Sequence, residues 1–395
     1  MKTNWQTKKL GEVCMVVGGG TPKTQVLEYW KNEIAWITPK DLGKIQDGKI
    51  DESAKMISQE GLEKSSAKLL PIGSVVLSSR APIGYVAISE VEIATNQGCR
   101  SFICGKDVYN KYLYYFLKFN TELLNKLGGG ATFREISGST LKQIPIPLPP
   151  LPEQHRIVKI LDEVFADVAK AKENAEKNLQ NAKELFESYL QSVFANPGKD
   201  WEEKRIGEVL QKTETIDPTK KPNEEFIYLD VSSVNKDTKQ IENATLLVGK
   251  NAPSRARKLV KTNDVIFATV RPTHSRVALI SEEYNNQVCS TGYFVLRAKD
   301  FLNNNLIYYF LLTHGFNKQM EKMQKGASYP AVNDGEVKNI FITFPKSLTE
   351  QKAIVTKLDI LSAKTQKLET IYKQKLSDLE ELKKAVLKKA FKGEL

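Results

Sequence analysis

Arginine, asparagine and glutamine side chains near predicted loops are the residues of this chain whose types could recognise a ligand. Arg can pair bidentately with guanine, and Asn or Gln with adenine, although most basic side chains on a DNA surface hold phosphates. The candidates in the first half are Lys40, Arg80, Asn96, Gln97, Arg100 and Arg134. The candidates in the second half are Arg255, Arg257, Lys258, Arg271, His274, Arg276 and Lys325. Any one of them could equally be a solvated surface group. Arg80 and Arg271 are the strongest because each follows a predicted strand beside a proline.

Segments that resemble catalytic or cofactor-binding motifs each lack a required residue. Residues 43–50 resemble a phosphate-binding loop, but Ile50 stands where a magnesium-binding Ser or Thr is needed. We interpret Asp47 and Gly48 as a turn between strands. The glycine runs at 18–20 and 128–130 lack the flanks of a dinucleotide fold, and no Asn/Asp-Pro-Pro-aromatic methyltransferase motif occurs. The histidines are far apart in sequence: His155, His274 and His314. We therefore predict no catalytic site, no metal and no directly bound cofactor.

Composition narrows the class of protein. A chain of 395 residues, 41% of them hydrophobic, is long enough for two or more domains. Lys and Arg number 58 against 47 Asp and Glu, and this net charge of +11 favours a polyanionic partner. We interpret the four cysteines, which form no CxxC pair, as buried small residues in a reducing compartment: Cys14, Cys99, Cys104 and Cys289. Without a long apolar run or a hydrophobic signal core, we expect a cytoplasmic protein with no membrane partner.

The sequence contains an internal repeat of two copies. Trp5 and the block 10–13 (LGEV) return as Trp201 and the block 206–209 (IGEV). Further matched blocks follow in order: 114–117 with 308–311, Gly130–Phe133 with Gly326–Tyr329, Glu153-Gln154 with Glu350-Gln351, and 157–162 with 354–359. The shift stays between 194 and 197 throughout. Chance similarity would not preserve order and spacing, so the sequence indicates a tandem duplication.

Each copy begins with a globular part that we predict to be mixed α and β. The apolar runs 75–77 and 265–267, bounded by Gly, Pro, Asn or Asp, are typical of buried strands. Segments 112–117 and 306–312 are predicted to be short amphipathic helices. Five prolines between 145 and 152 predict an extended segment that ends the first globular part, where the second copy keeps only Pro345.

A long helix is predicted after each globular part. Between Pro152 and Pro197 there is no Gly or Pro, and apolar or small residues recur at 157, 161, 164, 168, 171, 175, 179, 182, 185 and 189. Adding 197 gives a similar series in the second copy. Such spacing predicts a coiled-coil seam whose register shifts midway. The residues that we expect to pair the helices are Ile157, Leu161, Val164, Leu179, Ile354, Leu358, Leu361 and Leu376.

These elements predict an α+β protein: two mixed α/β domains in tandem repeat, separated by two long helices that pair as a coiled coil. The expected ranges are 1–151 and 197–348 for the domains, and 152–196 and 349–395 for the helices. The pairing could be antiparallel or parallel; alternatively each helix caps its own domain or mediates dimerisation. A helix of about 40 residues spans about 60 Å, and one turn of DNA duplex is about 34 Å. Paired helices could therefore hold two DNA-reading domains at a fixed separation.

The proline-rich block Ile144–Gln154, followed by Ile157 and Val158, resembles the signature of specificity subunits of type I restriction-modification systems. Three other stretches are similar to recurrent parts of that family: Trp5 with 10–13, Thr95–Gly98, and Ala390–Leu395. The resemblance covers essentially the whole chain and its half-repeat. The second copy departs from the pattern, with Phe344–Thr349 in place of the proline run.

This resemblance implies two target-recognition domains, each reading one half of a bipartite site in double-stranded DNA. It also implies that the paired helices fix the gap and recruit two methyltransferase (modification) subunits, with restriction or translocase subunits joining them. S-adenosylmethionine, ATP and Mg would belong to those partners, so the chain itself would be a non-catalytic subunit without cofactors.

Two other classes stay open from the residues. A coiled-coil adaptor would bind protein partners without DNA specificity, and its binding would be insensitive to salt. An enzyme fused to this recognition module would need methyltransferase or nuclease motifs, which these 395 residues lack. Neighbouring genes for a methyltransferase and a helicase-like nuclease would favour the specificity subunit.

The predicted seam makes a direct test possible. Leu361→Asp would place a charge in the seam, so we expect it to disrupt the helix pair and the recruitment of a methyltransferase subunit together. Co-purification of the two subunits measures this, and normal assembly of the variant would contradict the role given to the seam.

Overall fold

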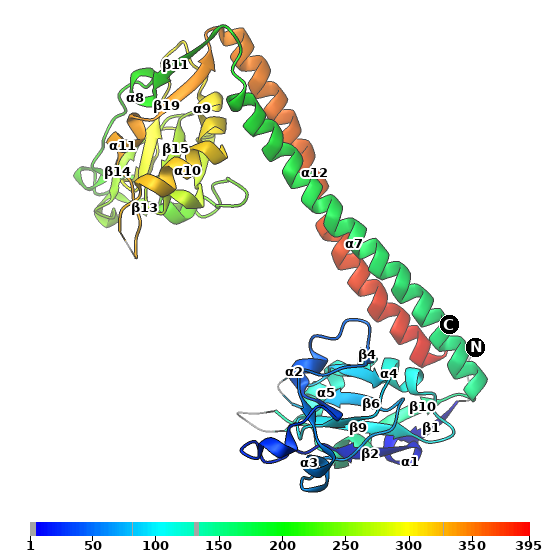
Figure 1. Ribbon diagram of the computed structural model, residues 1–395. Coiled ribbons are helices and arrows are strands. Elements are labelled where there is room, and N and C mark those ends of the chain that lie inside the picture. Colours follow the sequence, from blue (N-terminus) through cyan, green and yellow to red (C-terminus); the bar gives the residue numbers. More distant parts are fainter. Residues whose placement is uncertain (1–4, 81, 130–133, 327) are drawn as a thin grey trace. The chain divides into compact units, whose positions relative to one another are not determined.

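The structure, a computed structural model, describes residues 5–80, 82–129, 134–326 and 328–395 (Figure 1). Residues 1–4 of the N-terminus, the repeated block 130–133 and Ala327 of its second copy lie outside this description. The chain divides into two compact units that each combine a globular domain with parts of both long helices. The first unit is Met1–Ala175 with Gln374–Leu395, and the second is Glu176–Lys373.

The first globular domain has three sheets among its described residues. The largest has the strand order β2-β9-β6-β7-β4, with bounds Cys14–Gly18, Cys99–Cys104, Val75–Ser78, Val86–Ser89 and Lys49–Ile50. The second has the order β5-β3-β8, with bounds Met56–Ile57, Ile34–Ile37 and Ile93–Thr95. The third pairs β1 (Gln6–Lys9) with β10 (Pro145–Leu148). The helices are α1 (Leu10–Val13), η1 (Leu27–Tyr29), α2 (Pro39–Leu42), α3 (Gln59–Glu63), α4 (Asn110–Phe119), α5 (Thr121–Leu127) and α6 (Gly138–Lys142).

The second globular domain also has three sheets among its described residues. One has the order β13-β12-β17-β14, with bounds Thr245–Val248, Glu225–Leu229, Val288–Ser290 and Ala256–Leu259. Another has the order β16-β15-β18, with bounds Val277–Leu279, Val265–Ala268 and Tyr293–Leu296. The third pairs β11 (Trp201–Arg205) with β19 (Phe341–Pro345). The α-helices are α8 (Ile206–Val209), α9 (Asn304–Leu311), α10 (His314–Met323) and α11 (Asp334–Lys338), and the 3-10 helices are η2 (Pro218–Lys220), η3 (Val231–Ser233), η4 (Gly249–Asn251), η5 (Pro272–His274) and η6 (Glu282–Tyr284).

Both predicted buried strands and both predicted short helices are confirmed. Every residue of β6 and β15 is buried. Because side chains alternate along a strand, Val75 and Leu77 face the core that contains α4, whereas Val76 belongs to a core on the other face. Strand β15 divides in the same way between the core that contains α9 and a separate one. Each central strand therefore joins two apolar layers of its domain.

Two smaller sequence interpretations need revision. Asp47 and Gly48 follow α2 and precede β4, so they connect a helix to a strand, and the predicted turn between strands is wrong. Gly48 has φ +77°, and a Cβ there would lie 2.4 Å from the Tyr114 hydroxyl oxygen, which explains the glycine. Of the four cysteines, Cys104 is only half-buried; the buried ones are Cys14, Cys99 and Cys289. Burial raises the pKa of both Cys99 and Cys289 to about 12, which makes these two thiols unreactive.

The two long helices, α7 (Leu151–Ala195) and α12 (Leu348–Lys392), have 45 residues each. Helix α7 begins at Leu151, one residue before the predicted start at Pro152. A proline is tolerated within the first turn of a helix, so Pro152 does not prevent this start. Helix α12 ends at Lys392, and Gly393 follows with a φ of +71°, a conformation that commonly ends helices.

Within the first unit the helices run antiparallel. Arg156 on α7 donates a hydrogen bond to the carbonyl oxygen of Leu395, just beyond α12, at 2.9 Å. Farther along, Lys172 pairs with Glu380 at 3.2 Å, so the partner number falls as the α7 number rises. This answers the question of direction that the sequence left open, and Figure 1 shows the two helices side by side.

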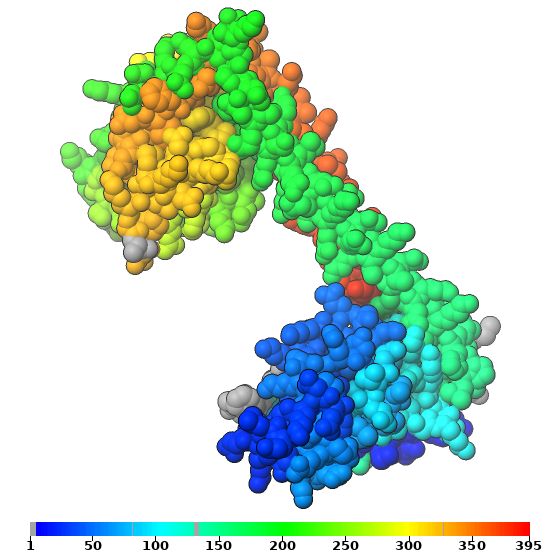
Figure 2. All heavy atoms as spheres, in the orientation of Figure 1, coloured from blue at the N-terminus to red at the C-terminus, as the bar shows by residue number. Residues whose placement is uncertain are grey.

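Both helices also cover the globular domains, so the pairing and capping alternatives occur together. The first core combines Ile157, Val158 and Leu161 of α7 with Leu387, Ala390 and Phe391 of α12. In the second core, Leu190 of α7 lies with Val355 and Leu358 of α12. In Figure 2 the region of α9 and α10 (yellow) borders α7 (green) directly.

The predicted seam is wrong at one of its later positions in each helix, although Ala182 in the same part of α7 is buried as predicted. Leu185 is 53% exposed, and its repeat partner Leu382 is 45% exposed. Phe186, Leu190 and Phe194 pack on the second core instead, at steps of four residues. The heptad-like seam fails here because this part of α7 packs against a globular domain as well as against a helix. The remaining helix-pairing candidates are partly buried. Ile354 packs on the second core. The others are half-buried: Val164, Leu179, Leu361 and Leu376.

The glutamine of the repeated Glu-Gln motif fixes each long helix to its domain. The fully buried Gln154 accepts a hydrogen bond from the Tyr109 amide at 2.9 Å, and donates to the carbonyl oxygens of Asp107 (2.9 Å) and Pro149 (2.8 Å). Gln351 makes the same three contacts in the second unit, with Asn303, Phe301 and Pro345. The junction without the proline run therefore has the same geometry as the junction that contains it.

Replacing Gln154 by Leu would leave three backbone groups without partners in a buried place. We expect the first unit to lose about 3 kcal/mol of unfolding free energy, since each buried unsatisfied group costs about 1–3 kcal/mol. Urea unfolding of the full chain measures the loss. Gln180→Leu, at an exposed position of α7, is the matched control, and an equal effect of both variants would contradict this anchoring role.

Candidate nucleic-acid interface

In each domain a hydroxyl residue directly after the central strand joins three segments. In the first domain, Ser79 donates from its amide to the carbonyl oxygen of Gly98 (2.8 Å), and its own carbonyl accepts from Ile136 (3.0 Å). Ile136 follows a narrow hairpin, in which Gly129 and Glu135 exchange two backbone hydrogen bonds of 3.0 Å. We call the region around Ser79, Gly98, Gly129 and Glu135 the first tip.

The second domain repeats this junction. Thr269 donates to the Gly292 carbonyl oxygen (2.8 Å) and accepts from Val332 (2.9 Å). Lys325 and Ala331 exchange hydrogen bonds of 2.9 and 3.0 Å across the second hairpin. We call the region around Thr269, Gly292, Lys325 and Ala331 the second tip. The repeat thus preserves a backbone scaffold at which three loops of each domain meet.

The first tip gathers most of the predicted first-domain residues. The Glu135 carboxylate contacts Arg100 Nη2 at 2.9 Å and Arg80 Nη1 at 4.0 Å. Asn96 accepts from the amide of Gly98 at 2.9 Å, and Gln97 accepts from the Thr21 hydroxyl. The two remaining candidates, Lys40 and Arg134, are exposed.

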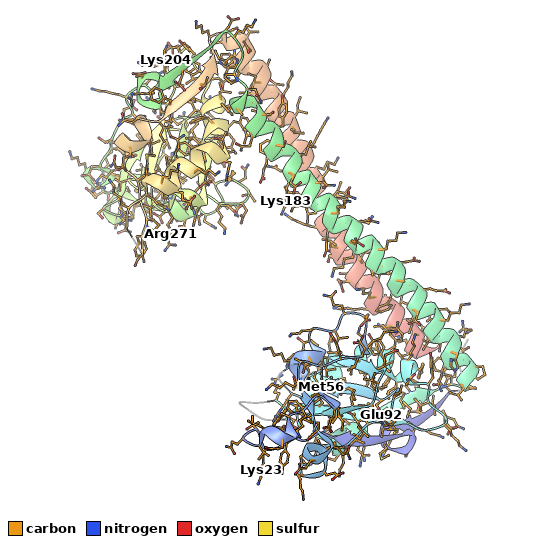
Figure 3. The ribbon with its side chains drawn as sticks, in the orientation of Figure 1. Lys23, Met56, Glu92, Lys183, Lys204 and Arg271 are labelled. Carbon is orange, nitrogen blue, oxygen red and sulfur yellow. The ribbon has the colours of Figure 1, made fainter. Side chains whose placement is uncertain are left out.

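The second tip gathers Arg255, Arg271 and Lys325. The Arg255 carbonyl oxygen accepts from Thr291, next to Gly292, and the Arg271 amide donates to Pro330 in the hairpin at 2.7 Å. The Arg271 guanidinium lies 5.2 Å from the ring centroid of Tyr329, whose exposed fraction is 72%. Lys325 extends into solvent and pairs with Glu336 at 3.0 Å. Figure 3 places Arg271 at the opposite end of the second unit from Lys204.

Other predicted second-domain residues have structural partners. Lys258 contacts Asp334 at 2.7 Å and donates to the Tyr293 carbonyl oxygen. Arg257 pairs with Asp217 at 3.5 Å, and Arg276 donates to the Val234 carbonyl oxygen. These three guanidinium and ammonium groups therefore have contacts within the second domain.

The loop that follows Arg271 is held in an uncommon conformation. Arg271 and Ser275, on either side of η5, both have left-handed backbones, with φ of +50° and +48°. Lys239 of a neighbouring loop donates to the Ser275 carbonyl oxygen at 2.7 Å, and burial lowers the pKa of its ammonium group. Burial first, and then the charge of Arg271, lowers the pKa of the exposed His274, as expected in a cationic surrounding. Such strain persists only where surrounding contacts fix it, and it often marks a functional loop.

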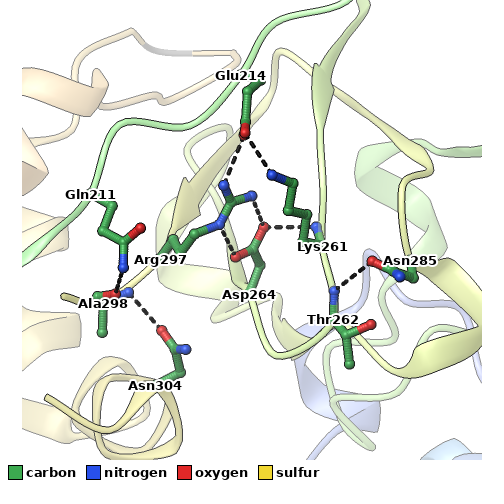
Figure 4. A network of polar contacts seen from close by, with 9 residues as sticks. All are labelled: Gln211, Glu214, Lys261, Thr262, Asp264, Asn285, Arg297, Ala298 and Asn304. Atoms are coloured by element: carbon green, nitrogen blue, oxygen red, sulfur yellow. Dashed lines mark hydrogen bonds and ion pairs between the residues drawn. The ribbon is translucent and has the colours of Figure 1, made fainter. Parts of the chain in front are cut away.

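The other end of the central strand is fixed by an ion network (Figure 4). Arg297 contacts the 1% exposed Asp264 with two hydrogen bonds of 2.8 Å, and Glu214 with a third of 2.8 Å. Lys261 reaches the same Glu214 at 2.7 Å, and hydrogen bonds from Lys261 and then Arg297 lower the Glu214 pKa to about 2. The equivalent of Asp264 in the first domain is Ser74, which hydrogen bonds to Pro71 at 2.6 Å. The network therefore stabilises the turn from which β15 runs to the second tip.

The described residues contain no group of three or more His, Cys, Asp or Glu arranged to hold a metal. The segment that resembles a phosphate loop ends in strand β4 and does not begin a helix, so it lacks the helix N-terminus that binds phosphate in such loops.

A groove of about 1340 Å³ in the second unit is lined by four lysines and four acidic residues, hence by no net charge: Lys183, Lys236, Lys239, Lys373, Glu184, Glu187, Asp237 and Glu369. No helix of the described residues has the length and apolarity that crossing a membrane demands.

Sequence reasoning missed two residues of the tips as candidates. Tyr329 is the last residue of the repeated block 326–329, so an aromatic residue that recurs three positions after a glycine in both copies was the available signal. Nothing in the sequence marked Glu135 as part of a DNA-binding surface, because only the fold brings its carboxylate to Arg80 and Arg100.

Two domains with matching scaffolds and different polar side chains at their tips define a two-headed recognition protein. The chain belongs to the type I restriction modification DNA specificity domain family, whose model matches residues 2–178 and 198–378.

Curated relatives agree with this family, and two solved structures share the fold. The MjaIX specificity subunit of a type I restriction enzyme from Methanocaldococcus jannaschii is 29% identical over 372 residues, which are 88% of this chain and 85% of that protein. The EcoR124I/EcoR124II specificity subunit of Escherichia coli is 30% identical over 205 residues, 50% of this chain and 49% of that protein. A chain from work on the assembly and conformational transition of a type I R-M system has the same fold, with a TM-score of 0.77 at 20% identity, covering 99% of this chain and 98% of that one. The HsdS subunit from Thermoanaerobacter tengcongensis gives a TM-score of 0.65 at 21% identity, with coverage of 99% and 97%.

The ion network predicts a stability difference between two arginines. Arg297→Met would leave the buried Asp264 without its partner, and we expect the second unit to lose about 3–5 kcal/mol of unfolding free energy. Arg257→Met is the matched control, because Arg257 and its partner Asp217 are partly exposed and the attraction within solvent-exposed ion pairs adds little to stability. Urea unfolding of both variants measures this, and similar losses would show that the network does not hold β15.

Proposed function

We propose that this chain is the DNA-reading subunit of a type I restriction-modification complex, in which each globular domain reads one half of a bipartite duplex site. The observation that carries the proposal is the recurrence of one backbone junction, around Ser79 and Thr269, with different side chains at each tip. A shared scaffold with different polar groups is what two readers of different half-sites need, because base edges are distinguished by their donors and acceptors. The net charge of +11 supports a polyanionic partner.

The long helices would set the gap between the half-sites and bind two modification subunits. Each helix has 45 residues, a length of about 68 Å at 1.5 Å per residue. Both helices are anchored in the apolar cores of the globular domains, which suits a rigid spacer. Restriction or translocase subunits would join the complex through the modification subunits or beside them.

The chain itself would be non-catalytic and would hold no cofactor. Ile50 replaces the required hydroxyl residue of a phosphate loop, and the glycine-rich segments lack cofactor patterns. S-adenosylmethionine, ATP and Mg would act in the partner subunits. This division leaves the choice of the DNA sequence to the described tips.

Co-expression with the source organism's modification subunit, followed by mapping of methylated adenines, tests the proposal. We expect one split motif, two short specified parts around a fixed gap. Arg271→Ala should abolish recognition in one half and retain the other, because Arg271 lies at the second tip only. Lys204→Ala, at the opposite end of the second unit (Figure 3), is the control and should leave the motif unchanged.

Two results would contradict the proposal, and a third would contradict only the role of Arg271. Methylation of a continuous motif would exclude two readers with a gap. A complex that forms without affinity for DNA at any salt concentration would favour the adaptor, since electrostatic DNA binding weakens steeply with salt. An Arg271→Ala variant with the normal motif would remove Arg271 from recognition.

A further inference from the structure

The two tips use different chemistry at equivalent positions, and this inference rests on the proposed function. Arg80 and Glu135 face each other across a backbone bridge, where the second tip has Val270 and Ala331. Arg100 lies opposite Leu77 in the sheet, where the second domain pairs Phe294 with Phe267. The ionic group of the first tip is thus replaced by apolar side chains in the second.

In the first tip, the Glu135 carboxylate contacts two arginines, Arg100 closely and Arg80 more loosely. Arg100 is 19% exposed; it contacts Glu135 at 2.9 Å and donates to the carbonyl oxygens of Gln97 and Cys99 at 3.0 Å each. The side chain of Arg80 is 38% exposed, and its Nη1 lies 4.0 Å from a Glu135 oxygen, a looser contact. Among the described residues it makes no closer side-chain hydrogen bond. The Arg100–Glu135 pair therefore forms a fixed support beside an arginine whose donors have no closer side-chain partner among the described residues.

The second tip supports its arginine with an aromatic ring. The guanidinium of Arg271 lies over Tyr329, while its backbone is fixed by the hydrogen bond to Pro330. A cation–π contact attracts the guanidinium to the ring and consumes no hydrogen-bond acceptor, so N–H donors of Arg271 can still bond to a ligand. Fixing a long side chain before binding lowers the entropy lost on binding.

We propose that Glu135 and Tyr329 are the positioning residues of DNA specificity. Each orients the reading arginine of its own tip, Arg80 or Arg271, for bidentate hydrogen bonding to a guanine in the major groove. Each half-site then contains a guanine whose recognition depends on a residue of the hairpin opposite the arginine. Glu135 has a second effect, because its negative charge repels DNA phosphates.

Selection from a library of randomised duplexes tests this, with the full chain bound to its modification subunit. Glu135→Gln should reduce the guanine preference at one position of one half-site by roughly tenfold to a hundredfold. Its affinity for non-specific DNA should rise, because a negative charge is removed. A merely structural defect would lower both quantities, so opposite changes identify positioning.

Tyr329 gives the matched pair of variants for the other half-site. Tyr329→Leu should cause a comparable loss of guanine preference, whereas Tyr329→Phe retains the ring and should retain the preference. Tyr329 is exposed, so neither change should unfold the domain, and the unaffected half-site in the same chain reports a folded complex.

The outcomes separate this inference from the proposed function. A wild-type complex that selects no sequence would overturn both. A split motif with no guanine in one half, or variants that keep the full preference at every position, would overturn the positioning role and leave the two-reader function intact. Loss of preference in Tyr329→Phe equal to that in Tyr329→Leu would show that the ring is not what positions Arg271.

Discussion

Burial of α4 and α9 against both long helices is the contact on which the rest of the structure depends. All residues of α4 from Tyr112 to Leu117 are buried, and Phe391, near the end of the chain, packs on Tyr112, Phe116 and Phe119 with ring centroids 5.3–5.5 Å apart. The first unit consequently contains both ends of the chain. Apolar burial of this kind is the dominant favourable term in folding, so the first unit requires the last helix in order to close its core.

The repeat shows which contacts between the long helices and the globular domains are common to both units. Phe194, one repeat length before Phe391, packs on Phe310 of α9 at 5.6 Å. Tyr115 donates to Asp162 at 2.6 Å, and Tyr309 donates to Asp359 in the same way. Aromatic, tyrosine–aspartate and glutamine contacts thus recur in both units, where they join helix to domain. The tips differ in the two units, which separates these shared structural contacts from the side chains that we propose to distinguish half-sites.

Several features could be predicted from the residues. Strands β6 and β15 follow from apolar runs between turn residues, and helices α7 and α12 follow from about 45 residues with helical periodicity and no interruption. The residues also predicted that Arg80 and Arg271 follow these two strands, whereas their role in DNA recognition stays a prediction. The seam was misassigned at Leu185 and Leu382, because periodicity reports that a face is apolar and does not report whether a helix or a domain covers it.

The sequence by itself determined the duplication, the order of domains and helices, and the family, because these are properties of local pattern and of order along the chain. The tertiary structure alone decided that the helices of the first unit run antiparallel, since their contacts join residues more than 200 positions apart. It also decided which charged groups are held and which are free. Arg100 is held by Glu135, Lys258 by Asp334 and Arg297 by Asp264. The partners of a charge come from other strands and loops, so the residue type shows only that a charge is present, and the fold determines what it can bind.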